Sequence, residues 1–139
     1  MPFTQPCFVR KNTIELRKKL EDLGYTYSNC DNINLDYIVT FPSTGKYSCF
    51  ASYHFNNEHF EKIWKIKYID CSDNEELFLA LAALRDDTDK NQYFICDKVS
   101  VTLGKTYYPC DYLYYQYGEF FDKQNWHKAT VKEIIKHFK

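Results

Sequence analysis

The sequence predicts an α+β fold in which about five to seven strands form a mainly antiparallel sheet beside three helices, one of them central and buried. Helix-capping patterns and short strand-like runs between turns support this class. The third observation is the segment Ser72–Ile95, where a helix that is apolar nearly all round runs into an acidic loop and then a strand. Because a helix without a polar face is buried on more than one side, we expect this one at the centre of the fold.

The first predicted helix spans Thr13–Leu23. Asn12 and Glu15 have the spacing of a capping box, and Gly24 is placed to end the helix. Leucines recur on one face and charged residues on the other, as in a helix that covers a core.

The central helix is predicted at about Asn74–Arg85, with Ser72 or Asp73 as its cap. The last helix is predicted at Val131–His137 and begins with an S/T-x-x-E box at Thr130. An apolar or aromatic run precedes each helix, so the order strand, cap, helix is expected three times. These lead-in runs are Cys7–Arg10, Tyr68–Cys71 and Asn125–Lys128.

Further strands are expected between the helices. Tyr37–Phe41 and Tyr47–Phe55 are predicted to form a hairpin around the turn Ser43–Lys46. The alternating run Ile63–Ile69 predicts another strand. The remaining candidates are Gln92–Cys96 paired with Lys98–Leu103 around Asp97, and the aromatic run Tyr112–Tyr117.

A length of 139 residues predicts a single domain, residues 1–139. The formal net charge of -1 gives no global field that favours nucleic acid, so no general nucleic-acid binding is expected. Basic residues gather near both ends of the chain and acidic residues between Asp70 and Asp89. We interpret these as solvated faces, with a local anion site as the alternative.

The N-terminal residues lack the apolar core of a signal peptide, and no run approaches the roughly 20 apolar residues of a membrane-spanning helix. A cytoplasmic protein with no membrane partner is therefore expected. The 6 cysteines are scattered without a C-x-x-C pair, which disfavours zinc. We expect them to be reduced, with four of them buried in strand-like runs.

The chain carries no catalytic or phosphate-binding motif of the common kinds. His54 and His59 do not form an H-E-x-x-H pattern, which disfavours a zinc peptidase. A cysteine nucleophile paired with a distant histidine stays open, although no cysteine stands out from the others. We expect a protein that is not an enzyme, with no cofactor and no metal.

Asp87, Asp89 and Asn91 match the first three ligand positions of a calcium loop. The match then fails, because Gln92 stands where glycine is needed and Lys98 where a bidentate glutamate is needed. The favoured interpretation is a polar turn that ends the central helix. We expect a buried ion pair of Arg85 with Asp86 and Asp87 to anchor this turn. Asp89→Ala is therefore expected to leave the fold intact. In the buried helix, by contrast, Leu81→Asp is expected to unfold the protein, because it places an unpaired charge in the core.

The run Tyr107–Tyr117 is unusually rich in tyrosine. On a strand, Tyr112 and Tyr114 share one face, and Tyr115 and Tyr117 share the other with Leu113. One face can pack on the core, and the other can expose tyrosines, which are favoured at interfaces and stack on bases. Core and binding surface both remain open for these residues.

Three segments resemble small uncharacterised proteins of gut Bacteroidales phages and prophages. They are ELRKKLEDLGY (Glu15–Tyr25), LFLALAALRDDTDKNQYFICD (Leu77–Asp97) and HKATVKEIIKHF (His127–Phe138). The resemblance implies a viral protein from a phage genome that works in the bacterial host cytosol. It brings no catalytic residues, because no activity is established for that family.

The leading hypothesis is therefore a phage-type accessory protein that binds a host protein or a nucleotide-like ligand, as in counter-defence. Its candidate binding residues are Arg85, Asp87, Asp89, Tyr112, Tyr114, Tyr115 and Tyr117. One alternative is a metal-dependent hydrolase or nuclease that uses the Asp86–Asn91 loop. Another is a virion or structural component that self-associates through an edge strand.

Overall fold

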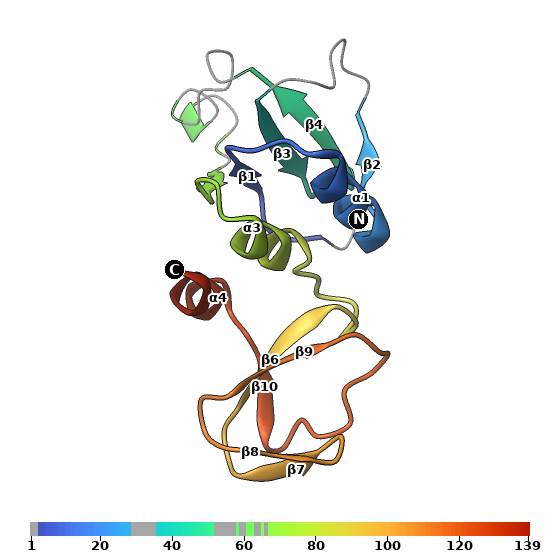
Figure 1. Ribbon diagram of the computed structural model, residues 1–139, viewed down its shortest axis with the longest axis vertical. Coiled ribbons are helices and arrows are strands. Elements are labelled where there is room, and N and C mark those ends of the chain that lie inside the picture. The colour runs from blue at the N-terminus through green and yellow to red at the C-terminus, as the bar shows by residue number, and fades with distance from the viewer. Residues whose placement is uncertain (1–2, 29–35, 52–57, 59–60, 63–64, 66) are drawn as a thin grey trace. The chain divides into compact units, whose positions relative to one another are not determined.

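A computed structural model describes residues 3–28, 36–51, 58, 61, 62, 65 and 67–139 (Figure 1). The chain divides into two compact units, Met1–Leu84 and Arg85–Lys139, hereafter the N-terminal and C-terminal units. The described residues form three helices and three sheets, which confirms the α+β class. The described strands are distributed over one mixed and two antiparallel sheets instead of the single sheet predicted, and five of their seven pairings are antiparallel as expected. That the whole chain is one domain stays a prediction.

The sheet of the N-terminal unit has five strands in the order β2-β4-β3-β1-β5. The predicted hairpin is present, because β3 and β4 pair antiparallel, and β1 pairs antiparallel with β3. Two parallel pairs, β1 with β5 and β2 with β4, make the sheet mixed. The strands are β1 (Cys7–Val9), β2 (Thr26–Tyr27), β3 (Tyr37–Phe41), β4 (Lys46–Phe50) and β5 (Ile69–Asp70).

Two helices of this unit pack against each other, and the second also packs on β1. Helix α1 spans Ile14–Leu23 and ends at Gly24, whose φ of 115° is left-handed, as predicted. The N-cap is Thr13 rather than Asn12, because the Thr13 hydroxyl accepts the N–H of Leu16 at 3.1 Å.

Helix α3 spans Glu75–Ala82 and is buried over most of its surface, which confirms the prediction for an apolar helix. Its N-cap is Asn74 instead of Ser72 or Asp73, since the Asn74 side chain accepts the N–H of Leu77 at 3.1 Å. The helix stops before Arg85, which belongs to the other unit.

The C-terminal unit is a sheet of three strands with a separate two-stranded ribbon and one helix. The sheet order is β10-β6-β9, and both pairs are antiparallel. The elements are β6 (Gln92–Cys96), β7 (Ser100–Thr102), β8 (Lys105–Tyr107), β9 (Tyr112–Tyr115), β10 (Trp126–Lys128) and α4 (Val131–Phe138). The predicted order of strand, cap and helix therefore occurs at β1–α1, β5–α3 and β10–α4.

The predicted pairing of Gln92–Cys96 with Lys98–Leu103 is wrong. Strand β7 pairs with β8, and β6 pairs with β9 and β10. The reason is a two-residue turn at Leu103 and Gly104, whose φ angles of 52° and 75° are both left-handed. Such a turn reverses the chain at once and joins adjacent strands.

The two faces of the β10-β6-β9 sheet have different coverings. One face holds a core of aromatic and sulfur side chains: Phe94, Cys96, Tyr115, Phe120 and Trp126. On the other face, α4 packs through Phe138 on Tyr93, with ring centroids 5.3 Å apart. The Thr130–Glu133 capping box predicted for this helix is present.

Several sequence predictions fall partly or wholly on residues outside the described ranges. They concern Cys30, His54, His59, the end of the predicted strand Tyr47–Phe55, and three of the seven residues of Ile63–Ile69. In the latter segment Lys65 has a left-handed φ of 54°, and the strand begins only at Ile69.

The predicted burial of four cysteines is confirmed at Cys7, Cys49, Cys71 and Cys96.

A candidate binding surface on the C-terminal unit

Arg85 and Asp87 form a two-point ion pair, with distances of 2.9 Å from both Nε and Nη2 to the carboxylate oxygens. The pair is not buried as expected, because the Asp87 side chain is 50% exposed and that of Arg85 28%. The hydrogen bonds from Arg85 lower the pKa of Asp87. An exposed pair of this kind contributes little to stability, so it does not anchor the loop.

The anchor is Asp89, whose side chain is only 10% exposed. Its carboxylate accepts the backbone N–H of Phe120 at 2.8 Å and lies 2.9 Å from Lys123 Nζ. Lys128 Nζ approaches the other oxygen at 3.5 Å and donates to the Thr88 carbonyl at 2.7 Å. Burial opposes ionisation of Asp89, but the contacts with Lys123 and Phe120 outweigh it and lower its pKa. Asp89 thus joins two loops of the unit.

The three side chains that resemble a calcium loop turn to different partners. Asp87 binds Arg85, Asp89 binds Phe120 and Lys123, and the Asn91 amide oxygen accepts the Tyr114 hydroxyl at 3.3 Å. In the described part of the chain, no group of three histidine, cysteine, aspartate or glutamate side chains is placed to hold a metal ion. Spacing along the chain therefore does not translate into converging ligands here.

The tyrosine run is divided between core and surface. Tyr115 lies in the core at 6% exposure. Tyr112 stacks on His137 of α4, with centroids 3.8 Å apart, and its hydroxyl donates to the Glu133 carbonyl at 3.0 Å. Tyr114 and Tyr117 are exposed at 37% and 63%. Of the four tyrosines predicted as a binding surface, only these last two present much area to solvent.

A hollow of about 350 Å³ lies between the loop after α3 and the loop after β9, lined by Asp86, Asp87, Thr88, Asp89, Gly118, Glu119 and Lys123. A second hollow adjoins it along Glu119–Gln124 and shares Glu119 and Lys123. Phe121, which lines the second hollow, and Tyr117, which precedes Gly118 of the first hollow in sequence, are each 63% exposed. We call Asp86, Asp87, Tyr117, Glu119 and Phe121 the acidic–aromatic rim.

The rim keeps negative charge although cations lie near it. Arg85 is occupied by Asp87, and Lys123 lies closer to the buried Asp89 (2.9 Å) than to Glu119 (3.8 Å). The Glu119 side chain is 86% exposed. The sequence pointed to Asp87 and Tyr117 but missed Glu119 and Phe121. The sequence signal that could have found Phe121 was the pair Phe120-Phe121. Phe120 fills the core, and Phe121 faces outward with its ring centroid 5.4 Å from that of Phe120.

A scan against protein-family models finds no match, and comparisons with curated proteins and with solved structures find none either. The resemblance to phage proteins therefore stays a prediction. Among the described residues, no helix is both long and apolar enough to cross a membrane.

Proposed function

We propose that this chain is a phage-type accessory protein that acts without catalysis, by binding a basic, partly apolar segment of a host protein at the acidic–aromatic rim. The observation that carries the proposal is that two exposed aromatic residues accompany the exposed carboxylates of these hollows: Phe121 lines the second hollow with Glu119, and Tyr117 precedes Gly118 of the first hollow in sequence. Exposed aromatics are frequent anchors of protein interfaces. Carboxylates beside them favour lysine and arginine in the partner, which also bind to aromatic faces.

The charge of the rim favours a basic protein segment over a nucleotide-like ligand. Tyr117 or Phe121 could stack on the base of a nucleotide, but the phosphates of that nucleotide would then lie near Asp86, Asp87 and Glu119. Like charges this close to one another disfavour binding. The two basic side chains near the rim are both already held, Arg85 by Asp87 and Lys123 by Asp89, each at 2.9 Å.

The described geometry offers less support for the metal-dependent hydrolase or nuclease. That activity would need carboxylates that converge on one point. Asp87 and Asp89 are instead each held by a basic side chain, Arg85 and Lys123. Isothermal calorimetry with magnesium, manganese and calcium tests this alternative directly, and heat that disappears in Asp87→Asn would favour it.

The binding proposal is tested with a fluorescent peptide of alternating lysine and valine, and with a second peptide in which glutamate replaces lysine. Fluorescence anisotropy should detect binding of the lysine peptide alone. Phe121→Ser and Glu119→Lys should each weaken binding about tenfold, as expected for an interface residue worth more than roughly 1 kcal/mol.

Two residues of the N-terminal unit supply matched controls. Ile14 is an exposed apolar residue at 55%, so Ile14→Ser matches Phe121→Ser. Asp22 is exposed in the last turn of α1, so Asp22→Lys matches the charge reversal at Glu119 and is compatible with the helix dipole. Equal binding of both peptides, or equal losses in rim and control variants, would contradict the proposal.

A further inference from the structure

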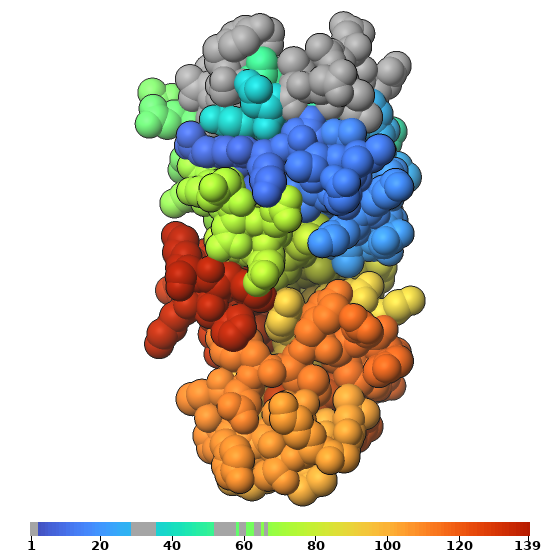
Figure 2. Space-filling view, viewed as in Figure 1, coloured from blue at the N-terminus to red at the C-terminus, as the bar shows by residue number. Residues whose placement is uncertain are grey.

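The β7–β8 ribbon has an exposed apolar face at the surface of the C-terminal unit (Figures 1 and 2). Three aliphatic side chains alternate along β7 and its flanks: Val99, Val101 and Leu103, exposed at 60%, 73% and 57%. Ser100 and Thr102 point to the opposite face and are buried, and Ser100 Oγ donates to Asp122 at 2.8 Å. The loop that holds Asp122 therefore covers the inner face of the ribbon, while the three aliphatic side chains lie at the surface.

Strand β7 is also an edge strand, because in the described part of the chain it pairs with β8 alone. A two-residue turn joins the two strands, which makes Thr102 and Lys105 a hydrogen-bonded pair. Such pairs alternate along an antiparallel ladder, so Ser100 and Tyr107 form the next one. Val101 lies between them, and its backbone N–H and C=O therefore point away from β8, toward the outer edge of the ribbon.

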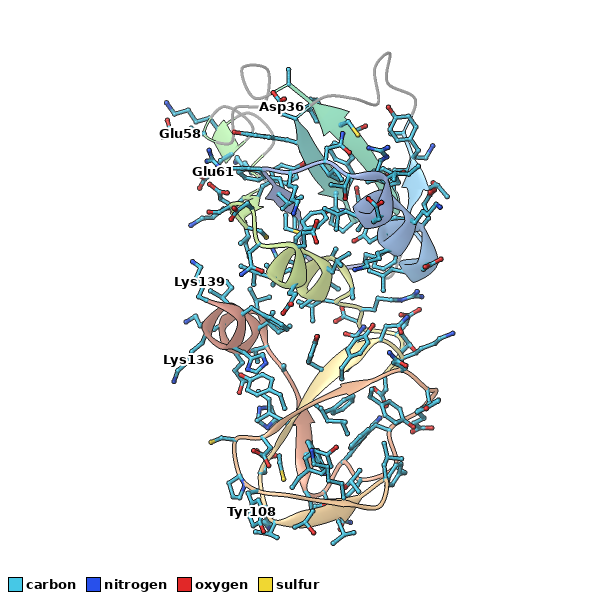
Figure 3. The ribbon with its side chains drawn as sticks, in the orientation of Figure 1. Asp36, Glu58, Glu61, Tyr108, Lys136 and Lys139 are labelled. Atoms are coloured by element: carbon cyan, nitrogen blue, oxygen red, sulfur yellow. The ribbon has the colours of Figure 1, made fainter. Side chains whose placement is uncertain are left out.

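The β7 edge lacks two devices that commonly protect an edge strand from pairing with another molecule, which are lysine and proline. The run Val99–Leu103 contains no charged residue and no proline. Strand β8 instead includes Lys105, and Pro109 follows soon after it. Between them stands Tyr108, whose side chain is 59% exposed and lies beside the ribbon in Figure 3. Of the two edges, that of β7 is the one suited to a further strand.

The sequence of this edge is symmetric in chemical character about Val101. It reads Val-Ser-Val-Thr-Leu, with a hydroxyl residue one position away from Val101 on either side and an aliphatic residue two positions away. Antiparallel pairing with the same segment of another molecule places Val101 opposite its counterpart, Val99 opposite Leu103, and Ser100 opposite Thr102. Each pair then joins side chains of one kind, and the outward backbone groups of the two Val101 residues meet at the twofold axis.

From these observations we infer that two copies of this chain associate through β7, so that their ribbons form one antiparallel sheet in the order β8-β7-β7-β8. A second copy is the occupant because it presents the same uncharged edge in a complementary register. The nearest charged residue along β7, Lys98, falls opposite Gly104 of the other copy, so no like charges face each other. The inference goes beyond the proposed function and uses no residue of the acidic–aromatic rim.

The size and chemistry of the contact predict how the dimer behaves. A standard interface buries about 800 Å² per partner, and one short strand with three aliphatic side chains offers less than that. We therefore expect a weak dimer, with a Kd on the order of 100 μM. High salt should not dissociate it, because no ion pair contributes. A symmetric contact is closed, so association should stop at the dimer.

Sedimentation velocity of the full chain, from about 10 μM to 1 mM, tests the inference. The wild type should change reversibly from monomer to dimer. Val101→Lys and Val101→Glu should each stay monomeric, because like charges then face each other across the axis. An equimolar mixture of these two variants should dimerise again, since lysine then faces glutamate. Because Val101 is 73% exposed, both variants should keep the circular dichroism spectrum of the wild type.

The matched control is Thr106→Lys. Thr106 is the exposed cross-strand partner of Val101 on β8, so this change adds the same charge to the same face at the other edge. It should dimerise as the wild type does. The inference is overturned by a wild type that stays monomeric, by species larger than dimers, or by a mixture of the two Val101 variants that does not associate. Loss of the dimer in Thr106→Lys but not in Val101→Lys would also overturn it, because pairing would then use β8.

Discussion

At the residue scale, the Asp89 carboxylate connects two loops of the C-terminal unit that are far apart along the chain. Its neighbours along the chain, Asp86 and Asp87, are exposed, whereas Asp89 is buried against a loop 31 residues away. The expectation that Asp89→Ala leaves the fold intact is therefore revised, because the carboxylate satisfies the Phe120 N–H and faces two lysines.

Asp89→Ala should lower the free energy of unfolding by about 2 to 4 kcal/mol, because a buried N–H and a charged partner lose their acceptor. Chemical denaturation followed by tryptophan fluorescence measures this, since Trp126 packs at 5.7 Å from Phe120. Asp87→Ala is the matched control and should unfold at nearly the wild-type midpoint. If both variants unfold at the same midpoint, Asp89 is not the anchor.

Cys110 is a residue in a conformation that suits glycine. It occupies the third position of the turn Tyr108–Asp111 with a φ of 76°, after Pro109. A turn with proline second and a left-handed third residue strongly favours glycine there. Cys110→Gly should therefore raise the free energy of unfolding by about 0.5 to 1 kcal/mol, because the backbone strain that it relieves is larger than the conformational entropy that glycine adds to the unfolded chain. Cys110→Ala, which keeps the strain, should show no such gain, and equal stabilities of the two variants would argue against strain.

At the element scale, α4 is held to the sheet by an imidazole between two carboxylates. His127 Nδ1 lies 2.7 Å from Asp97 and Nε2 lies 2.9 Å from Glu133. The hydrogen bond with Glu133, aided by Asp97, raises the pKa of His127 above 6.5 despite partial burial. Only the protonated ring can donate to both carboxylates at once.

The stabilisation from His127 is fully present below pH 6.5, the value for the unfolded chain, and is lost as pH rises through the higher pKa of the folded state. Thermal melting at a series of pH values from about 6 upward should show the midpoint falling as pH rises. His127→Asn should flatten this dependence, while His137→Asn, a change of the histidine in α4, should retain it. Parallel curves for the wild type and His127→Asn would exclude the imidazole as the cause.

The burial of α3 makes a second prediction at this scale. Leu81 is 0% exposed, so Leu81→Asp places an unpaired charge in the core and should cost about 4 kcal/mol or more. Leu79→Asp, two residues away at a partly exposed position, should be tolerated much better. Circular dichroism and denaturation of both variants measure the difference. Similar unfolding of the two would mean that α3 is not buried on the face described.

Local features of the elements were predictable because they depend on near neighbours. The Thr130–Glu133 box and the turn at Gly24 need only three or four residues to specify them. The cap of α3 was misplaced because Ser72, Asp73 and Asn74 all cap helices well, and only the backbone selects Asn74. Strand partners were harder, since the pairing of β6 with β9 and β10 depends on contacts far along the chain.

At the scale of the whole molecule, the segment Ser72–Ile95 contributes to two compact units rather than to one centre. Helix α3 belongs to the N-terminal unit and β6 to the C-terminal unit, with the boundary after Leu84. No glycine or proline marks that boundary, so the sequence pattern does not reveal it.

The rim was only half predictable for a related reason. Asp87 could be recognised from its loop, but the exposure of Phe121 and Glu119 follows from how Phe120 enters the core.

Binding of basic segments at the acidic–aromatic rim can be measured residue by residue in one titration. The full chain, labelled with ¹⁵N, is titrated with the lysine–valine peptide at a fixed protein concentration, and backbone amide shifts are followed by NMR. If the rim is the binding surface, the largest shifts fall on residues 86–89 and 117–123. Shifts centred elsewhere, or no saturable shifts at all, would contradict it.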